Sequence, residues 1–112
     1  MKCFSKTKNI LVSENIKIAQ TYFSRMKGLL RKTSLPQGEG LYITKCKQVH
    51  TFFMKFAIDV VFIDEKGKVL KIVYNMKPWR ISPFIFSAFA TYEFNAGFVK
   101  GKISEGDILE IK

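Results

Sequence analysis

The stretch HTFFMKFAIDVVFID, residues 50–64, decides the fold because hydrophobic and β-branched residues dominate it on both sides of an extended chain. If the second half of this stretch forms a strand, Val61 and Ile63 share one face and Val60 lies on the other. Both faces are hydrophobic, so the strand is expected to be buried on both sides. Asp59 would point the same way as Val61. An ionised carboxylate is costly there unless hydrogen-bond donors meet it, so Asp59 needs a structural or functional partner.

The same stretch suggests a hairpin with a turn near residues 55–57. If residues 56 and 57 form the turn, Met54 pairs with Asp59, and His50 pairs with Ile63. Four strand positions at about 3.3 Å each would then separate His50 from Asp59 by about 13 Å. We therefore expect no direct contact between these two polar side chains within the hairpin.

Composition indicates one soluble domain over residues 1–112, with 47% hydrophobic residues. Cys3 and Cys46 are too few for a disulfide scaffold, and we expect no structural disulfide. The first ten residues contain lysines where a secretory signal would be apolar, and the longest uncharged run, residues 81–92, is too short to span a bilayer. We therefore expect a cytoplasmic protein without a membrane partner.

The net charge of +10 allows a nucleic-acid or anionic-surface interpretation. Lysines are scattered over nearly every segment, and of the 19 basic residues only Arg25, Arg31 and Arg80 are arginines. Arginine is the usual residue for bidentate phosphate and base contacts. The pattern therefore favours a solvated lysine coat over a nucleic-acid interface.

Further short strands are predicted at residues 10–12, 16–19, 41–43, 69–74, 91–94 and 108–111. The first two are expected to form a hairpin that turns at Glu14–Asn15. Hydrophobic residues at helical spacing predict a short helix from about Tyr22 to Gly28. The Asp64–Gly67 tetrapeptide is typical of a hairpin turn, since Asp accepts backbone hydrogen bonds and Gly permits a positive φ.

These elements predict a mostly β (α+β) fold, a compact antiparallel β-barrel-like or sandwich domain with one short helix. Strands do not alternate with long helices, which argues against a parallel α/β fold.

The sequence resembles domain of unknown function family 192 over about residues 16–112. The resemblance is carried by Arg25, residues 28–30, 40–41, Cys46, 50–54, 58–64, 67–69, 77–80, Glu93, 96–97 and 106–107. It implies a small β-rich domain, found mainly in prokaryotes, without an established biochemical activity. Ala57 and Asn95 stand where the family commonly has proline, and neither departure removes a polar candidate residue.

Candidate catalytic residues are the polar side chains embedded in hydrophobic segments. Cys46 as nucleophile, His50 as base and Asp59 or Glu93 as orienting carboxylate have suitable residue types, but no local signature supports them. Asp59 and Glu93 could also act as a glycosidase-type carboxylate pair. The structural alternative is a buried thiol, a core histidine and two carboxylates that accept backbone or hydroxyl hydrogen bonds.

Binding candidates centre on the run from Lys77 to Arg80. Trp79 could provide a stacking platform, and Arg80 with Arg25 and Arg31 could line an anion or sugar pocket. The alternative is that the indole and the aliphatic stems pack over the end of the β-fold.

We therefore expect a non-catalytic module that binds a small polar or anionic ligand, or a protein partner. The expected ligand-binding residues are His50, Thr51, Asp59, Trp79, Arg80 and Glu93. We expect no cofactor, and a single histidine with two distant cysteines supplies too few ligands for zinc. Two alternatives stay open: a hydrolase-like enzyme using His50 with Asp59, Glu93 or Cys46, and a basic module that binds nucleic acid through its lysines.

Overall fold

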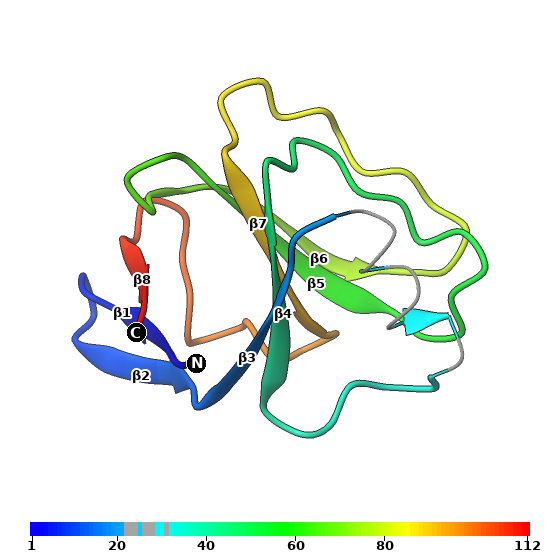
Figure 1. Ribbon diagram of the computed structural model, residues 1–112, viewed down its shortest axis with the longest axis horizontal. Coiled ribbons are helices and arrows are strands. Elements are labelled where there is room, and N and C mark those ends of the chain that lie inside the picture. Colours follow the sequence, from blue (N-terminus) through cyan, green and yellow to red (C-terminus); the bar gives the residue numbers. More distant parts are fainter. Residues whose placement is uncertain (22–24, 26–28, 31) are drawn as a thin grey trace.

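A computed structural model describes residues 1–21, 25, 29, 30 and 32–112 of the chain. It is mostly β, as predicted, and its strands form two sheets (Figure 1). The described strands are β1 (Cys3–Ser5), β2 (Ile10–Ser13), β3 (Asn15–Ala19), β4 (Glu39–Thr44), β5 (Ile58–Ile63), β6 (Val69–Met76), β7 (Ala90–Asn95) and β8 (Leu109–Ile111).

The two sheets pack against each other through one hydrophobic cluster. The smaller sheet has the order β2-β1-β8 and the larger has the order β3-β4-β7-β5-β6. Cys3, Val12 and Leu109 of the smaller sheet join Val61 and Phe94 of the larger sheet in this cluster. Neither sheet closes into a barrel in the described part of the chain, because β3 and β6 are the edges of the larger sheet.

The opposite face of the larger sheet carries a second hydrophobic cluster, which includes Val60 and Phe62 of β5. Two irregular segments, residues 45–57 and 77–89, run side by side along the upper and right-hand rim in Figure 1. Backbone hydrogen bonds join them along their length: Cys46 N to Phe89 O, Ile85 N to Lys47 O, Ser82 N to Val49 O and Thr51 N to Arg80 O, at 2.8–3.2 Å. We call this pair of segments the loop ribbon.

The predicted hairpin over residues 50–64 is wrong in its first half. β5 begins at Ile58, and its neighbours are β6 on one edge and β7 on the other. Both edges are therefore occupied, and residues 50–57 have no edge of β5 to pair with. Instead, His50 forms an isolated antiparallel bridge with Ile81 in the loop ribbon.

The predicted hairpin between residues 10–12 and 16–19 is also wrong. Only Glu14 lies between β2 and β3, which is shorter than the two-residue loop that a tight hairpin needs. The chain instead crosses from the smaller sheet to the larger one, where β3 pairs with β4 in parallel. This pair is parallel, whereas the other strand pairs of the two sheets are antiparallel.

The predicted turn after β5 is confirmed. Asp64–Gly67 forms the predicted turn between β5 and β6, with Gly67 N donating to Asp64 O and Gly67 at a φ of 84°. Cys3 and Cys46 are free and buried, in different hydrophobic clusters. The helix predicted from about Tyr22 to Gly28 lies largely outside the described residues. Within that range Arg25 alone is described, and it is helical. In the described ranges, helices long and hydrophobic enough to cross a membrane do not occur.

Candidate functional site

Thr51 joins the two segments of the loop ribbon through hydrogen bonds. Its side chain is fully buried, and its hydroxyl donates to Lys77 O at 2.6 Å and accepts from Arg80 N at 2.9 Å. Its backbone carbonyl accepts from Trp79 N at 3.0 Å and from Met54 N at 3.2 Å. This predicted site residue therefore positions the neighbouring aromatic residues, with its own hydroxyl engaged by the backbone.

Phe53 and Trp79 are presented to solvent by an unfavourable backbone conformation. Their φ angles are 66° and 65°, in the left-handed region that bulky side chains rarely adopt, at a cost of about 1–3 kcal/mol each. Their rings contact each other at 4.6 Å between centroids, yet they remain 65% and 55% exposed. Burial of hydrophobic surface therefore does not account for this conformation.

His50 forms the inner part of the same aromatic group. Its ring stacks on Phe52 at 4.7 Å, and Phe52 lies 6.1 Å from Trp79. The Nδ1 atom of His50 accepts a hydrogen bond from Phe52 N at 3.3 Å, which requires that Nδ1 be unprotonated. Partial burial and the nearby positive charge of Arg25 lower the pKa of His50, which favours the neutral ring.

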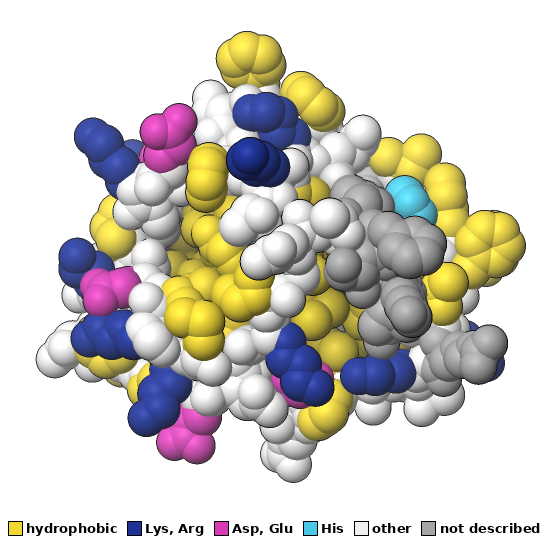
Figure 2. Space-filling view, in the orientation of Figure 1, with side chains coloured by type: hydrophobic (Ala, Val, Ile, Leu, Met, Phe, Trp, Pro, Cys, Tyr) yellow, Lys and Arg dark blue, Asp and Glu magenta, His cyan; other side chains and the backbone are white. Residues whose placement is uncertain are grey.

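A shallow cavity of about 250 Å³ opens beside His50. It is lined by Gln48, Val49, His50, Phe52 and Ile81. In Figure 2 the single histidine of the sequence lies at the surface beside a group of hydrophobic side chains on the right-hand side. The site therefore combines exposed aromatic rings with imidazole and amide groups.

Glu93 reaches this site through Arg25. Both residues are fully buried, and Arg25 Nε donates to the two carboxylate oxygens of Glu93 at 2.6 and 2.9 Å. Arg25 Nη1 also donates to the backbone carbonyl of His50 at 3.0 Å. Burial raises the pKa of Glu93, and the guanidinium of Arg25 opposes this effect. The ion pair thus connects β7 to the loop ribbon, and Glu93 itself is not open to a ligand.

Asp59 lies on the opposite face of the larger sheet. In the β5–β7 register it pairs with Phe94, whereas Glu93 pairs with Val60. Paired residues share a face and successive residues alternate, so the sheet separates the two carboxylates. The structure therefore does not bring Asp59 to the site around His50, and it does not form a carboxylate pair of Asp59 with Glu93.

The two oxygens of Asp59 accept hydrogen bonds from three backbone N–H groups. The donors are Asn75 at 2.8 Å, Gly97 at 3.0 Å and Val99 at 3.2 Å. Asn75 in β6 and Gly97 after β7 both have positive φ, so Asp59 fixes two left-handed backbone conformations next to its strand. The fully buried carboxylate is solvated by the backbone, which supplies the partner that the sequence pattern demanded.

Cys46 has the surroundings of a structural thiol. It is 2% exposed, its Sγ donates to Gln48 O at 3.3 Å, and burial raises its pKa. Nucleophilic cysteines need the thiolate, which a raised pKa disfavours. These features support the structural interpretation of Cys46 over the nucleophilic one.

Several exposed residues of the loop ribbon are not among the expected ligand-binding residues. Ile81, Phe84 and Phe86 of the loop ribbon are 60%, 58% and 80% exposed. A usable signal was present in the sequence: residues 45–57 and 77–89 contain no Asp or Glu, but they contain Lys45, Lys47, Lys55, Lys77 and Arg80. Hydrophobic loops with charge of one sign are candidates for an anionic partner.

Comparison with known proteins finds a family and two relatives that are similar to this chain. The family described as "Uncharacterized ACR" matches residues 4–111. A UPF0127 protein of Pyrococcus horikoshii is 31% identical over 82 residues, which cover 69% of each chain. A UPF0127 protein of Thermococcus sibiricus is 32% identical over 84 residues, and the match covers 68% of this chain and 51% of that relative.

The fold also occurs in a crystal structure of a protein of unknown function from Novosphingobium aromaticivorans. The TM-score is 0.81 at 20% sequence identity, and the match covers 98% of this chain and 82% of that chain. At this level of identity, the similarity establishes the fold alone.

Proposed function

We propose, for a chain that belongs to domain of unknown function family 192, that the loop ribbon is a binding surface for an anionic ligand with a hydrophobic part. The family match confirms the resemblance found in the sequence. On this proposal the domain acts by binding, and His50, Trp79 and Arg80 are the predicted site residues that meet the ligand. Thr51 and Glu93 position them, and Asp59 has a structural role elsewhere.

One observation carries the proposal: the exposed pair of Phe53 and Trp79 is held in left-handed backbone conformations. Strained residues persist where the surrounding structure enforces them, and they cluster at ligand sites. Here the hydrogen bonds of Thr51 enforce the strain, although the rings gain little burial from it. The free energy that this costs is understandable if a ligand covers the rings.

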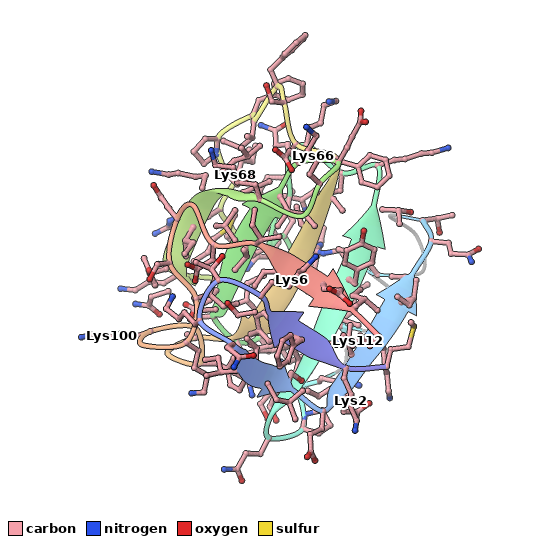
Figure 3. The ribbon with its side chains drawn as sticks, turned by 90° about the vertical axis from the view of Figure 1, so that its left-hand side faces the viewer. Lys2, Lys6, Lys66, Lys68, Lys100 and Lys112 are labelled. Atoms are coloured by element: carbon pink, nitrogen blue, oxygen red, sulfur yellow. The ribbon has the colours of Figure 1, made fainter. Side chains whose placement is uncertain are left out.

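Charge supports an anionic ligand over a neutral one. The loop ribbon carries Lys and Arg but no carboxylate, which favours an anionic partner. A general nucleic-acid surface is less well supported, because further lysines lie on another side of the molecule, namely Lys2, Lys6, Lys66, Lys68, Lys100 and Lys112 (Figure 3). The positive charge of this protein is therefore not concentrated in one stripe.

The proposal is tested by NMR titration of labelled protein with sugar phosphates, nucleotides and aromatic carboxylates. We expect shift changes at His50 and Trp79 with at least one anionic compound, and loss of binding in His50→Ala and Trp79→Ala. Tyr74→Ala is the matched control, since Tyr74 is 53% exposed and lines a separate cavity with Asp59. Equal weakening by the control, or shifts confined to the Asp59 cavity, would contradict the proposal.

A further inference from the structure

Apart from Met1, the most exposed large hydrophobic side chains of the described residues lie along the loop ribbon. Phe53, Trp79, Ile81, Phe84 and Phe86 are 55–80% exposed. In Figure 2 hydrophobic side chains project from the upper and right-hand margins of the molecule, where the loop ribbon runs in Figure 1. Isolated exposed hydrophobic residues are ordinary, but such a series along one rim marks an interaction surface.

The two segments of this rim contain basic residues but no acidic residue. On other parts of the described surface, carboxylates pair with lysines, as in Lys6–Glu110, Lys17–Glu39 and Lys112–Glu110. Lys55, Lys77 and Arg80 are exposed in segments that lack Asp and Glu. The rim thus offers hydrophobic side chains flanked by cations of uncompensated charge.

Part of the backbone of the rim is paired between the two segments, which reduces the number of unpaired groups that would face a nonpolar phase. Backbone hydrogen bonds join the two segments from the Cys46–Phe89 pair to the Thr51–Arg80 pair. In addition, Lys47 Nζ donates to the carbonyl oxygens of Phe86 and Ala88 at 2.6 and 3.0 Å. Unpaired backbone groups are the main cost of placing irregular chain near hydrocarbon. The loop ribbon lowers this cost by internal pairing.

We propose that the loop ribbon seats this protein on an anionic lipid surface. This rests on the proposed function and names its ligand class. Trp79, Ile81 and Phe86 enter the interfacial region, where aromatic side chains are favoured, and Lys55, Lys77 and Arg80 meet anionic headgroups. The earlier expectation of no membrane partner rested on the lack of a spanning segment, and surface seating needs none.

A lipid surface fits the rim better than an acidic peptide or a nucleic acid does. The described cavity in the rim holds only about 250 Å³, which is small for a peptide segment, whereas a membrane accepts projecting side chains without an enclosing groove. Single-stranded nucleic acid would use stacked rings with arginines, but Arg80 is the sole arginine of residues 45–57 and 77–89, and the aliphatic Ile81 offers no stacking face.

The test is binding of the full chain to vesicles of phosphatidylserine and phosphatidylcholine, compared with phosphatidylcholine alone. Trp79 is the only tryptophan of the sequence, so its emission reports directly on the rim. We expect a blue shift with anionic vesicles, quenching by lipids brominated near the headgroup, and binding that weakens as salt rises. Ile81→Ser with Phe86→Ser should weaken binding at least tenfold, and Lys77→Glu about fivefold or more.

The matched control is Lys2→Glu, the same charge change on another side of the molecule (Figure 3). An unshifted Trp79 emission with anionic vesicles overturns the inference, as does an equal loss of binding in Lys2→Glu. Binding of an acidic peptide or of oligonucleotides without vesicle binding also overturns it, but leaves the proposed function standing. If neither vesicles nor soluble anions perturb His50 and Trp79, both proposals fail.

Discussion

Replacing Asp59 by Asn should destabilise the protein although the two side chains have nearly the same shape. One carboxylate oxygen accepts from Asn75 N, and the other accepts from Gly97 N and Val99 N. An amide has one acceptor oxygen, so its NH₂ group must face at least one of these backbone donors. That donor becomes a buried group without a partner, which costs about 1–3 kcal/mol.

The remaining hydrogen bonds of Asp59→Asn lose their ionic character, which weakens each by about 1 kcal/mol, while removal of a buried charge offsets part of the loss. We therefore expect the free energy of unfolding to fall by about 2–4 kcal/mol, a large share of the about 5–15 kcal/mol typical of a domain. Urea denaturation at neutral pH, followed by Trp79 fluorescence and by circular dichroism, measures this difference.

Asp64→Asn is the matched control for this experiment. Asp64 also accepts from two backbone N–H groups, those of Lys66 and Lys68, but it is only partly buried in an exposed turn. Both donors bond to Oδ1, an acceptor that the amide of Asn can also supply, and the turn is open to water, so the expected loss is below about 1 kcal/mol. A change of less than about 1 kcal/mol in Asp59→Asn, or an equal loss in Asp64→Asn, would refute the reasoning about buried backbone donors.

Three further predictions concern the loop ribbon and the sheet. Thr51→Val keeps the side-chain shape but removes both hydroxyl hydrogen bonds, so the free energy of unfolding should fall by about 1–3 kcal/mol. Quenching of Trp79 fluorescence by iodide should increase in the same variant. Thr51→Ser, which keeps the hydroxyl, should show a smaller change in both measurements. The pKa of His50 is lowered from 6.5 in the folded chain, so its stabilising contribution is complete above about pH 6.5 and is lost as the pH falls towards the folded pKa. The difference in unfolding free energy between the natural chain and His50→Gln should therefore shrink as the pH falls through that range. A difference that does not depend on pH would contradict the assignment. Gly40→Ala would place a Cβ 2.4 Å from Phe94 Cε1, so calorimetry should show a destabilisation of about 1–3 kcal/mol or more, and an unchanged melting temperature would mean that the ring moves freely.

Patterns within a few consecutive residues were enough to predict several strands and one turn. The hydrophobic residues on both sides of residues 58–63 identified a strand buried on both faces, and all six residues of β5 are buried. The Asp64–Gly67 turn and the alternation of Tyr92 and Phe94 with Glu93 were equally visible. In each case the relevant physical constraint acts over a few residues, through side-chain alternation or turn geometry.

Pairing between distant segments could not be predicted in the same way. Residues 50–54 have the composition of a strand, but β6 and β7 occupy both edges of β5. The competition for an edge is decided by all strands together, so the loop had to find its partner in residues 77–89 instead. The same limit explains the parallel pairing of β3 with β4.

The candidate site divides along similar lines. The sequence by itself identified His50, Thr51, Trp79 and Glu93 as polar or aromatic residues in unusual positions, and it contained the acid-free segments of the rim. Only the tertiary structure decided that the larger sheet separates Asp59 from Glu93, because the face on which a residue lies relative to a distant strand depends on their register. Likewise, only the hydrogen bonds that Thr51 makes across the loop ribbon hold Phe53 and Trp79 in left-handed conformations, which local preference disfavours.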